Sequence, residues 1–262
     1  MGSGFVWKNR YWILRHGKSI PNERGLIVSS LENGIFEEYQ LASDGVHQAR
    51  LAGESFLKAG ACLTSLRLRL APQAMGARIA LELKEHEIDL ENVRICYSPF
   101  SRTTHTAKVV ASVLNIQFED GPQCKVMQDI RERFFGSLYE LQSHDKYPEI
   151  WALDEKDPFM QPEGGESVAD VVTRLTRALA MMESEFEKCA VLIVSHGDPL
   201  QILQTIIVNV AAAAAKEHEN SPPVNDLISR IDAVRGVPSV LSQHRKFALN
   251  TGQLRQLVTI GP

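Results

Sequence analysis

The chain has 262 residues, of which 44% are hydrophobic and 23% charged, so it is long enough to bury one large core. Its formal net charge of -4 gives no support for a nucleic-acid or anionic-membrane partner, and no apolar run reaches the length of a membrane span. Because the first residues lack a secretory pattern and the cysteines form no Cys-x-x-Cys pair, we expect a cytoplasmic protein with free thiols at Cys62, Cys96, Cys124 and Cys189.

The first predicted strand, residues 11–14, ends abruptly in Arg15, His16 and Gly17. In open α/β sheets, ligands bind outside the carboxyl ends of the strands, so these side chains would stand where chemistry usually occurs. A neutral imidazole is a competent nucleophile, and a neighbouring guanidinium suits a tetrahedral oxyanion. The tripeptide therefore suggests phosphoryl transfer, although a single histidine at a strand end is more often structural.

A helix is predicted over residues 44–58, and the segment 59–80 interrupts its apolar pattern. Removing 59–80 would place Leu83 four residues after Leu57 and restore a helical pair. The alternating leucines and arginines of 66–70 would form an edge strand or an exposed loop. We interpret 59–80 as an insertion, either a flexible surface excursion or an artefact of the gene sequence.

A second strand is predicted at residues 93–97, and a helix at 102–114 carries Arg102 in its first turn. Glu132 follows in the setting Arg131-Glu132-Arg133. From the residues alone, a carboxylate between two arginines is as easily a surface salt bridge as a catalytic acid.

The clearest helix is predicted from Ser167 to about Lys188, with an apolar stripe that faces the core and a capping signature at Ser167 and Asp170. A strand at 190–194 then leads into Ser195, His196 and Gly197, which repeats the layout of the first strand end. Two such histidines could face each other across one phosphate. We expect a helix at 199–209, an irregular excursion near 211–245 with a short helix around 226–234, and a last strand at 254–260.

Taken together, these segments resemble the histidine phosphatase superfamily, also called phosphoglycerate-mutase-like proteins. The resemblance extends from Tyr11 to about Thr259. It depends on Arg15-His16-Gly17 with Asn22, the 41–49 stretch, Ser98–Ala107, Glu132, the loop Gly164–Ser167, and Ser195-His196-Gly197.

Strands that alternate with helices already indicate an α/β fold. The resemblance implies a three-layer sandwich, with a mostly parallel sheet covered by helices on both faces. We expect one histidine-phosphatase-like domain over residues 5–262, with the insertion near 59–80 and the excursion near 211–245.

The resemblance also implies the roles of the site residues. His16 would attack phosphorus and hold it as a phosphohistidine, while Arg15, Arg102 and His196 would surround the phosphate oxygens and Asn22 would add a neutral hydrogen bond. Glu132 would be the general acid. The eight histidines offer no metal-ligand spacing, so neither a metal nor another cofactor is expected.

Several assignments stay open at this stage. A bound phosphate would raise the pKa of Glu132 and its arginine neighbours would lower it, and the sequence does not say which effect prevails. Arg133 would either touch substrate or pair with a carboxylate. Asp198, which would repel phosphate if it pointed inward, is expected to point away.

The expected activity is hydrolysis of a small-molecule phosphate monoester. One alternative is a phosphoglycerate-mutase-type phosphotransferase, and another is a non-catalytic protein that binds a phosphorylated ligand. The stretch 134–162 favours hydrolysis, because it is rich in acidic residues and lacks the paired arginines that the resemblance leads one to expect in a mutase. Neither the substrate nor the oligomeric state follows from the sequence.

Overall fold

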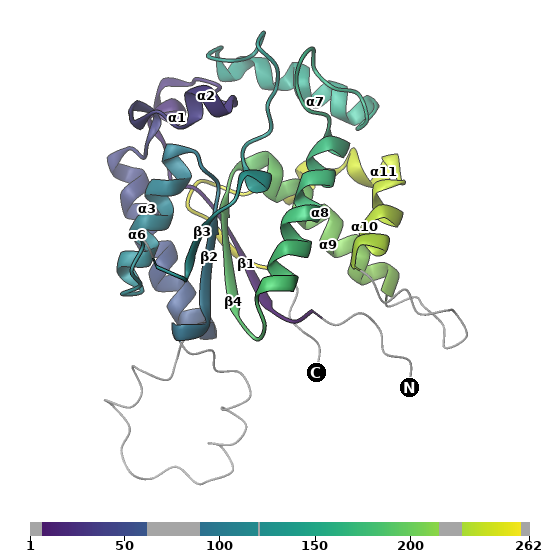
Figure 1. Cartoon of the computed structure of the whole chain (residues 1–262). Coiled ribbons are helices and arrows are strands. Elements are labelled where there is room, and N and C mark those ends of the chain that lie inside the picture. The colour runs from purple at the N-terminus through teal and green to yellow at the C-terminus, as the bar shows by residue number, and fades with distance from the viewer. Residues whose placement is uncertain (1–6, 62–89, 120, 215–226, 258–262) are drawn as a thin grey trace, which may run out of the picture.

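The five strands form one mixed sheet in a computed structural model that describes residues 7–61, 90–119, 121–214 and 227–257 (Figure 1). The sheet has the order β3-β2-β4-β1-β5. Its strands are β1 (Arg10–Arg15), β2 (Val93–Tyr97), β3 (Cys124–Val126), β4 (Ala190–Ser195) and β5 (Leu254–Gln256). The pairs β1–β4, β2–β4 and β2–β3 are parallel, and only β5 is antiparallel to its neighbour β1.

Helices precede and follow these strands along the chain. The α-helices are α1 (Ile20–Arg24), α2 (Leu31–Gly34), α3 (Ser43–Phe56), α6 (Ser101–Val113), α7 (Tyr147–Lys156), α8 (Val168–Glu185), α9 (Gly197–Ala214), α10 (Leu227–Arg235) and α11 (Pro238–Leu241). Short 3-10 turns are η1 (Glu37–Tyr39), η3 (Leu90–Asn92), η4 (Gln128–Ile130), η5 (His144–Lys146) and η6 (His244–Phe247), and η2 (Leu57–Ala61) is a π-helical turn after α3.

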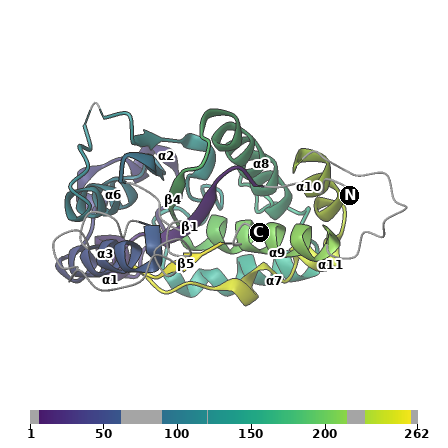
Figure 2. The same ribbon diagram turned by 90° about the horizontal axis from the view of Figure 1, so that it is seen from below.

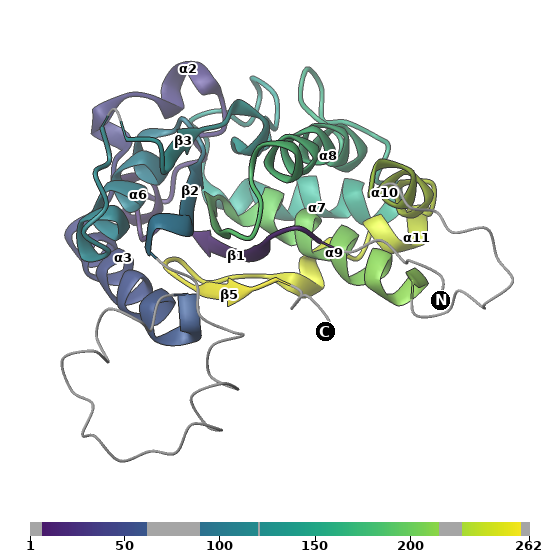
Figure 3. The same cartoon turned by 60° about the horizontal axis from the view of Figure 1, so that its bottom comes forward.

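The sheet separates two hydrophobic cores, because alternate residues of a strand point to opposite faces. Tyr11 and Ile13 of β1 pack with residues of α8, α9 and α10, whereas Trp12 and Leu14 pack with residues of α3 and α6. Figures 2 and 3 show these helix groups on opposite sides of the sheet. The structure therefore confirms the predicted three-layer α/β sandwich.

The register of the central strands brings the two histidine motifs together. Arg15 at the end of β1 lies opposite Ser195 at the end of β4, so the next residues, His16 and His196, emerge side by side. Above these strand ends lie α1, α2 and α7 (Figure 1). The site is therefore formed at the carboxyl edge of the sheet, as expected for this architecture.

Some predicted elements differ from the structure. α9 continues through Ala214 rather than ending at 209, because alanine has the highest helix propensity. The expected excursion at 211–245 therefore includes the end of α9 and the helical segments α10, α11 and η6, and α10 confirms the predicted short helix. Residues 62–80 of the expected insertion, residues 215–226, and residues 258–260 of the last predicted strand lie outside the described residues.

The edge strand β3 and the helix α7 were not predicted, and neither were the short helices α1, α2 and α11. In the described part of the chain, none of the helices combines the length and the apolar character needed to cross a membrane.

Candidate active site

His16 leaves the end of β1 and is held there by its backbone. Its amide donates to the carbonyl of Ser195 over 3.0 Å, and the next amide, of Gly17, donates to Oγ1 of Thr106 over 3.2 Å. The side chain is only 2% exposed. The neighbouring parallel strand and α6 therefore fix the position of the imidazole.

The partners of the His16 ring identify which nitrogen is available for chemistry. Nδ1 lies 2.7 Å from the carbonyl oxygen of Gly17, which can only accept, so Nδ1 carries the proton. Nε2 lies 3.1 Å from Nε of Arg102, which can only donate, so Nε2 presents its lone pair. Burial, followed by the charges of Arg102 and Arg15, holds the pKa of His16 well below its usual range. The imidazole is therefore neutral, as a nucleophile must be.

Arg102 stands in the first turn of α6 and is 4% exposed. Its Nη2 donates to the carbonyl of Val28 over 3.0 Å and lies 3.6 Å from Oε2 of Glu132. Its guanidinium carbon lies 4.8 Å from the centre of the Phe100 ring. These contacts fix the planar group next to the nucleophilic nitrogen of His16.

His196 faces His16 at the end of β4, with the two ring centres 5.3 Å apart. Its Nε2 lies 2.7 Å from Oγ of Ser98, and its Nδ1 lies 3.6 Å from Oε2 of Glu132. The imidazole is fully buried, and burial together with the charge of Arg102 holds its pKa well below the usual range. His16, Arg102, Glu132 and His196 are thus brought together as predicted.

Three buried nitrogens in and beside this group make no hydrogen bond to any described residue: Nε of Arg15, Nη1 of Arg102 and Nδ1 of His196. Arg15 is the last residue of β1, and a Cβ added to Gly197, the residue after His196, would lie 3.5 Å from the guanidinium carbon of Arg15. Leaving buried donors without partners costs about 1–3 kcal/mol each. A tetrahedral anion offers the acceptor oxygens that these nitrogens require.

Glu132 follows the turn η4 and is 8% exposed. Burial and, to a smaller extent, the negative charge of Asp198 raise the pKa of its carboxyl to about 7, although the charge of Arg102 opposes them. The guanidinium groups of Arg131 and Arg133 are paired with other carboxylates, of Glu166 and Asp154 respectively. In the structure, burial therefore outweighs the nearby arginine charges, and the effect of a bound phosphate on this pKa stays a prediction.

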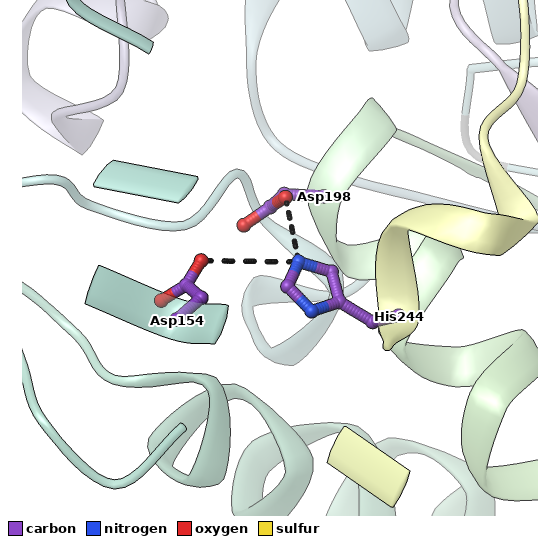
Figure 4. Close-up of side chains that lie close together, drawn as sticks. All are labelled: Asp154, Asp198 and His244. Carbon is purple, nitrogen blue, oxygen red and sulfur yellow. Dashed lines mark ion pairs between the residues drawn. The ribbon is translucent and has the colours of Figure 1, made fainter. Parts of the chain in front are cut away.

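No described contact links Arg133 to His16 or to the ring of His196. Its side chain is fully buried, donates two hydrogen bonds to Asp154 over 2.7 and 2.8 Å, and donates a third to Asp198 over 3.1 Å. Asp198 also pairs with His244, and Figure 4 shows the carboxylates of Asp154 and Asp198 facing that imidazole. The structure thus has the second of the two roles considered for Arg133, pairing with carboxylates, and a contact of Arg133 with substrate stays a prediction.

Asn22 is also engaged elsewhere. Its Oδ1 accepts from the amide of Ser19 over 3.0 Å and from the Ser19 hydroxyl over 2.9 Å, which together cap α1. No described contact links it to His16. A substrate contact through the amide nitrogen of the Asn22 side chain stays a prediction.

Sequence reasoning missed two further side chains near the site, Ser98 and Tyr147. Ser98 orients His196, but a serine after a strand carries no specific signal. The ring of Tyr147, in the first turn of α7, stacks on Trp151 with centres 5.6 Å apart. Burial raises the pKa of the Tyr147 phenol, and so does the charge of Glu132.

Comparisons with known proteins agree with this fold. Two solved structures with a similar fold are the product of the Mycobacterium tuberculosis open reading frame Rv3214 (22% identity, TM-score 0.54, covering 97% of each chain) and a mycobacterial glucosyl-3-phosphoglycerate phosphatase complexed with VO3 (20% identity, TM-score 0.53, covering 79% of this chain and 85% of that one). A third is a mutant phosphoserine phosphatase from Entamoeba histolytica bound to phosphoserine, with 15% identity, a TM-score of 0.56, and coverage of 94% of this chain and 88% of that one. These similarities show the fold. Curated protein sequences give no match.

The family model of the histidine phosphatase superfamily (branch 1) matches residues 73–241. The matched region includes Arg102, Glu132 and His196 and begins after His16. Since it covers more than half of the sequence, the chain belongs to the histidine phosphatase superfamily.

Proposed function

We propose that this chain is a metal-independent phosphatase that hydrolyses small phosphate monoesters through a phosphohistidine on Nε2 of His16. The observation that carries the proposal is the neutral imidazole of His16, whose Nε2 lone pair lies next to the unpaired buried donors of Arg102 and His196. Its protonated Nδ1 bonds to Gly17, so the ring needs no proton transfer before it attacks.

In the first step, Nε2 of His16 attacks phosphorus, forming the P–N bond while the bond to the leaving oxygen breaks. Arg15, Arg102 and His196 would donate to the equatorial oxygens, where charge shifts as the phosphoryl group moves. For His196 this requires the proton on Nδ1, so that Nε2 accepts from the Ser98 hydroxyl. Asn22 would add a neutral hydrogen bond.

Glu132 would donate its proton to the leaving oxygen. The carboxylate thus formed would then take a proton from water as the water attacks phosphorus, which breaks the P–N bond and releases phosphate. A pKa of about 7 suits both roles, because the acid form and the base form are each accessible near neutral pH. Fixed donors supply the positive field in this scheme, so it uses no metal or other cofactor.

The described residues also bear on the mutase alternative. Within 134–162, Lys146 is paired with Glu149, and Asp154 is buried against Arg133. A mutase must hold a second acidic group of its substrate and exclude water. Because these charged side chains are already paired, we favour hydrolysis over return of the phosphoryl group to the substrate.

Two of the structurally similar proteins are named as phosphatases of phosphate monoesters, glucosyl-3-phosphoglycerate and phosphoserine. We infer a substrate of that broad class for this chain. We also propose that residues 5–262 act as one domain, because the site and its surroundings draw on residues from Arg15 to His244. A reducing, cytoplasmic compartment suits the free thiols of Cys96, Cys124 and Cys189.

The test is a rapid-quench reaction with a panel of phosphate monoesters that includes both of those compounds. Alkaline work-up preserves phosphohistidine, and mass spectrometry of the digested protein should find the phosphoryl group on His16. His16→Ala should lose turnover by a factor of about a thousand or more. A label on another residue, or normal turnover without His16, would refute the mechanism. Release of an isomer instead of free phosphate would favour the mutase.

A further inference from the structure

A buried cluster of charged side chains begins at Arg133, the residue that follows Glu132. Figure 4 shows three of its members: Asp154 of α7 and His244 of η6, which are completely buried, and Asp198 of α9, which is 9% exposed. Arg133 pairs with both aspartates. Buried charges are costly unless they are paired. This cluster therefore demands an explanation beyond general stability.

The contacts of His244 favour the charged form of its imidazole. Nδ1 lies 3.0 Å from the carbonyl oxygen of Leu241, and Nε2 lies 3.5 Å from Oδ1 of Asp198 and 3.9 Å from Oδ2 of Asp154. Each nitrogen thus faces oxygens that accept hydrogen bonds, so a proton on both nitrogens is favoured. Burial alone would lower the pKa of His244, but the two aspartates outweigh it and raise the pKa.

Asp154, Asp198 and His244 also have the ligand types of a divalent cation site, with their ligand atoms within 4.8 Å of one another. Arg133, however, already donates two hydrogen bonds to Asp154 and one to Asp198. With His244 charged, Arg133 and His244 balance the charges of the two carboxylates. The cluster is therefore a set of ion pairs rather than a metal site.

This cluster contacts the proposed acid from two directions. The backbone amide of Arg133 donates to Oε1 of Glu132 over 3.0 Å. On the other side, Asp198 is two residues beyond His196, whose Nδ1 lies 3.6 Å from Oε2 of Glu132. The ion pairs that hold the Arg133 side chain and Asp198 consequently restrain the surroundings of both carboxyl oxygens.

We propose that Asp198 and His244 are positioning residues for Glu132, which act through Arg133 and exert opposite electrostatic effects on the Glu132 carboxyl group. This inference rests on the proposed role of Glu132 as the general acid. Asp198 favours the protonated acid because its negative charge disfavours a second carboxylate nearby. His244 moderates that effect by pairing with Asp198, so the acid is not held permanently protonated.

Other groups act on Glu132 from the elements around it, and they stay in place in the test. They are Arg15 of β1, Arg102 of α6, Tyr147 of α7, Arg174 of α8 and His196 at the end of β4. Because these groups are common to every variant below, a difference between variants reports the cluster itself.

The experiment compares Asp198→Asn with His244→Gln in the full-length chain. Asp198→Asn should lower the pKa of Glu132 by about one unit, and His244→Gln should raise it by a similar amount, because each removes one charge of opposite sign. The carboxyl titration is followed by NMR with 13C-labelled glutamate, and Glu132→Gln identifies the resonance. The pH at which kcat falls on the alkaline side should move in the same two directions.

The matched control is Glu183→Gln, which removes a buried carboxylate that binds Asn9 and Tyr11 at the other end of β1. It should lower stability without moving the titration of Glu132. The inference is overturned if neither variant shifts the pKa of Glu132, or if Asp198→Asn and His244→Gln shift it in the same direction. A general loss of structure has no reason to produce shifts of opposite sign. If Asp198→Asn does not fold, the upward shift in His244→Gln decides alone, and its absence refutes the proposal.

The proposed function fails separately from this inference. If Glu132→Gln keeps full activity and the same pH profile, Glu132 is not the acid, whatever the NMR titrations show. If Glu132→Gln loses activity but neither cluster variant moves the titration, the acid role stands and the positioning role is wrong.

Discussion

The Glu132 carboxyl shows how a single buried residue can trade stability for reactivity. Its pKa is raised from 4.5 to about 7, mainly by burial, so the folded chain binds a proton at Glu132 more tightly than the unfolded chain does. Its contribution to the free energy of unfolding is therefore greatest below about pH 4.5. It falls as the pH rises toward 7, by roughly 3 kcal/mol in total.

We therefore expect Glu132→Gln to gain stability over the wild type as the pH rises, while it loses activity. The Tm difference between the two proteins should be small at pH 5 and should grow in favour of the variant by pH 8. Differential scanning calorimetry across this range measures it. A Tm difference that is independent of pH would show that the carboxyl does not titrate near 7 in the folded protein.

The same carboxyl predicts the pH dependence of turnover. Because the acid form of Glu132 must donate to the leaving group, kcat should decline as the pH rises through about 7. Since the pKa of His16 lies well below its usual range, kcat should not also decline on the acidic side near the usual pKa of a histidine. Glu132→Gln should reduce kcat by about a hundredfold or more and remove the alkaline decline. Steady-state kinetics with one substrate of the panel, from pH 5 to 9, provides the check.

At this scale the sequence predicted the placement of the two histidines well and that of the surrounding charges poorly. His16 and His196 each follow an apolar strand, and that local pattern is readable from sequence. Arg133 was ambiguous because its partners, Asp154 and Asp198, come from distant segments. His244 carried no signal, since nothing in its neighbourhood in the sequence shows that it would face two buried carboxylates.

At the scale of elements, the backbone that follows β1 packs closely against the start of α3. A Cβ added to Gly17 would come within 2.2 Å of the Gly45 carbonyl oxygen, and one added to Gly45 would come within 2.0 Å of the Lys18 carbonyl oxygen. Both obstacles are backbone atoms, which cannot rotate away. This close approach sets the direction in which His16 leaves the strand.

Gly45→Ala should destabilise the protein by about 2–3 kcal/mol, although alanine is the better residue in a helix. Gly236→Ala is the matched control, because the nearest atoms to its added Cβ are 3.6 Å away. Urea unfolding monitored by circular dichroism compares the two variants. Equal midpoints would contradict a close contact between the end of β1 and α3.

The carboxylate of Glu140 forms a clamp of hydrogen bonds that fixes the start of α2. It accepts hydrogen bonds from the amides and hydroxyls of Ser29 and Ser30 and from the side chain of Asn33. Burial alone would raise the pKa of Glu140, but these hydrogen bonds outweigh it and lower the pKa. The neighbouring Val28 carbonyl accepts from Arg102, so the clamp also supports the site.

Glu140→Gln should therefore lower stability at neutral pH by about 1 kcal/mol, with allowance for partial exposure of this carboxylate to solvent. A group with a lowered pKa stabilises the fold above its unfolded pKa and loses that effect as the pH falls. The Tm deficit of the variant should thus shrink toward acidic pH, opposite in trend to Glu132→Gln. Thermal unfolding at pH 4 and pH 7 separates this prediction from a deficit that is constant with pH.

The elements that were predicted correctly have strong periodicity, such as the apolar stripe of α8 and the buried run of β4. β3 was missed because it has only three residues, with Lys125 in the middle, at the edge of the sheet. α7 was missed because few of its side chains are buried, chiefly Ile150 and Asp154, so no apolar stripe marks it. Packing against neighbouring segments decides such short or exposed elements.

At the scale of the whole molecule, anion binding and catalysis can be measured separately. Inorganic phosphate that binds only the folded chain should raise the unfolding free energy by about 2.7 kcal/mol at a hundred times its Kd. Arg102→Ala should lose this stabilisation, whereas His16→Ala should keep most of it and lose turnover. Differential scanning fluorimetry against phosphate concentration measures both.

Lys125→Ala is the control for general loss of positive charge, because Lys125 is paired with Glu185 at the surface. It should respond to phosphate as the wild type does. If Arg102→Ala and the wild type respond equally, phosphate binds somewhere other than the predicted site. If phosphate binds the wild type but no phosphoester is turned over, the non-catalytic alternative is the better description.

The position of β1 has a consequence for how the chain is made. β1 is paired on one side with β4 and on the other with β5, both of which leave the ribosome long after it. His16, the proposed nucleophile, therefore emerges early during synthesis, at the end of an apolar strand whose partners are made much later. Such late, distant pairing slows folding and leaves the segment open to self-association.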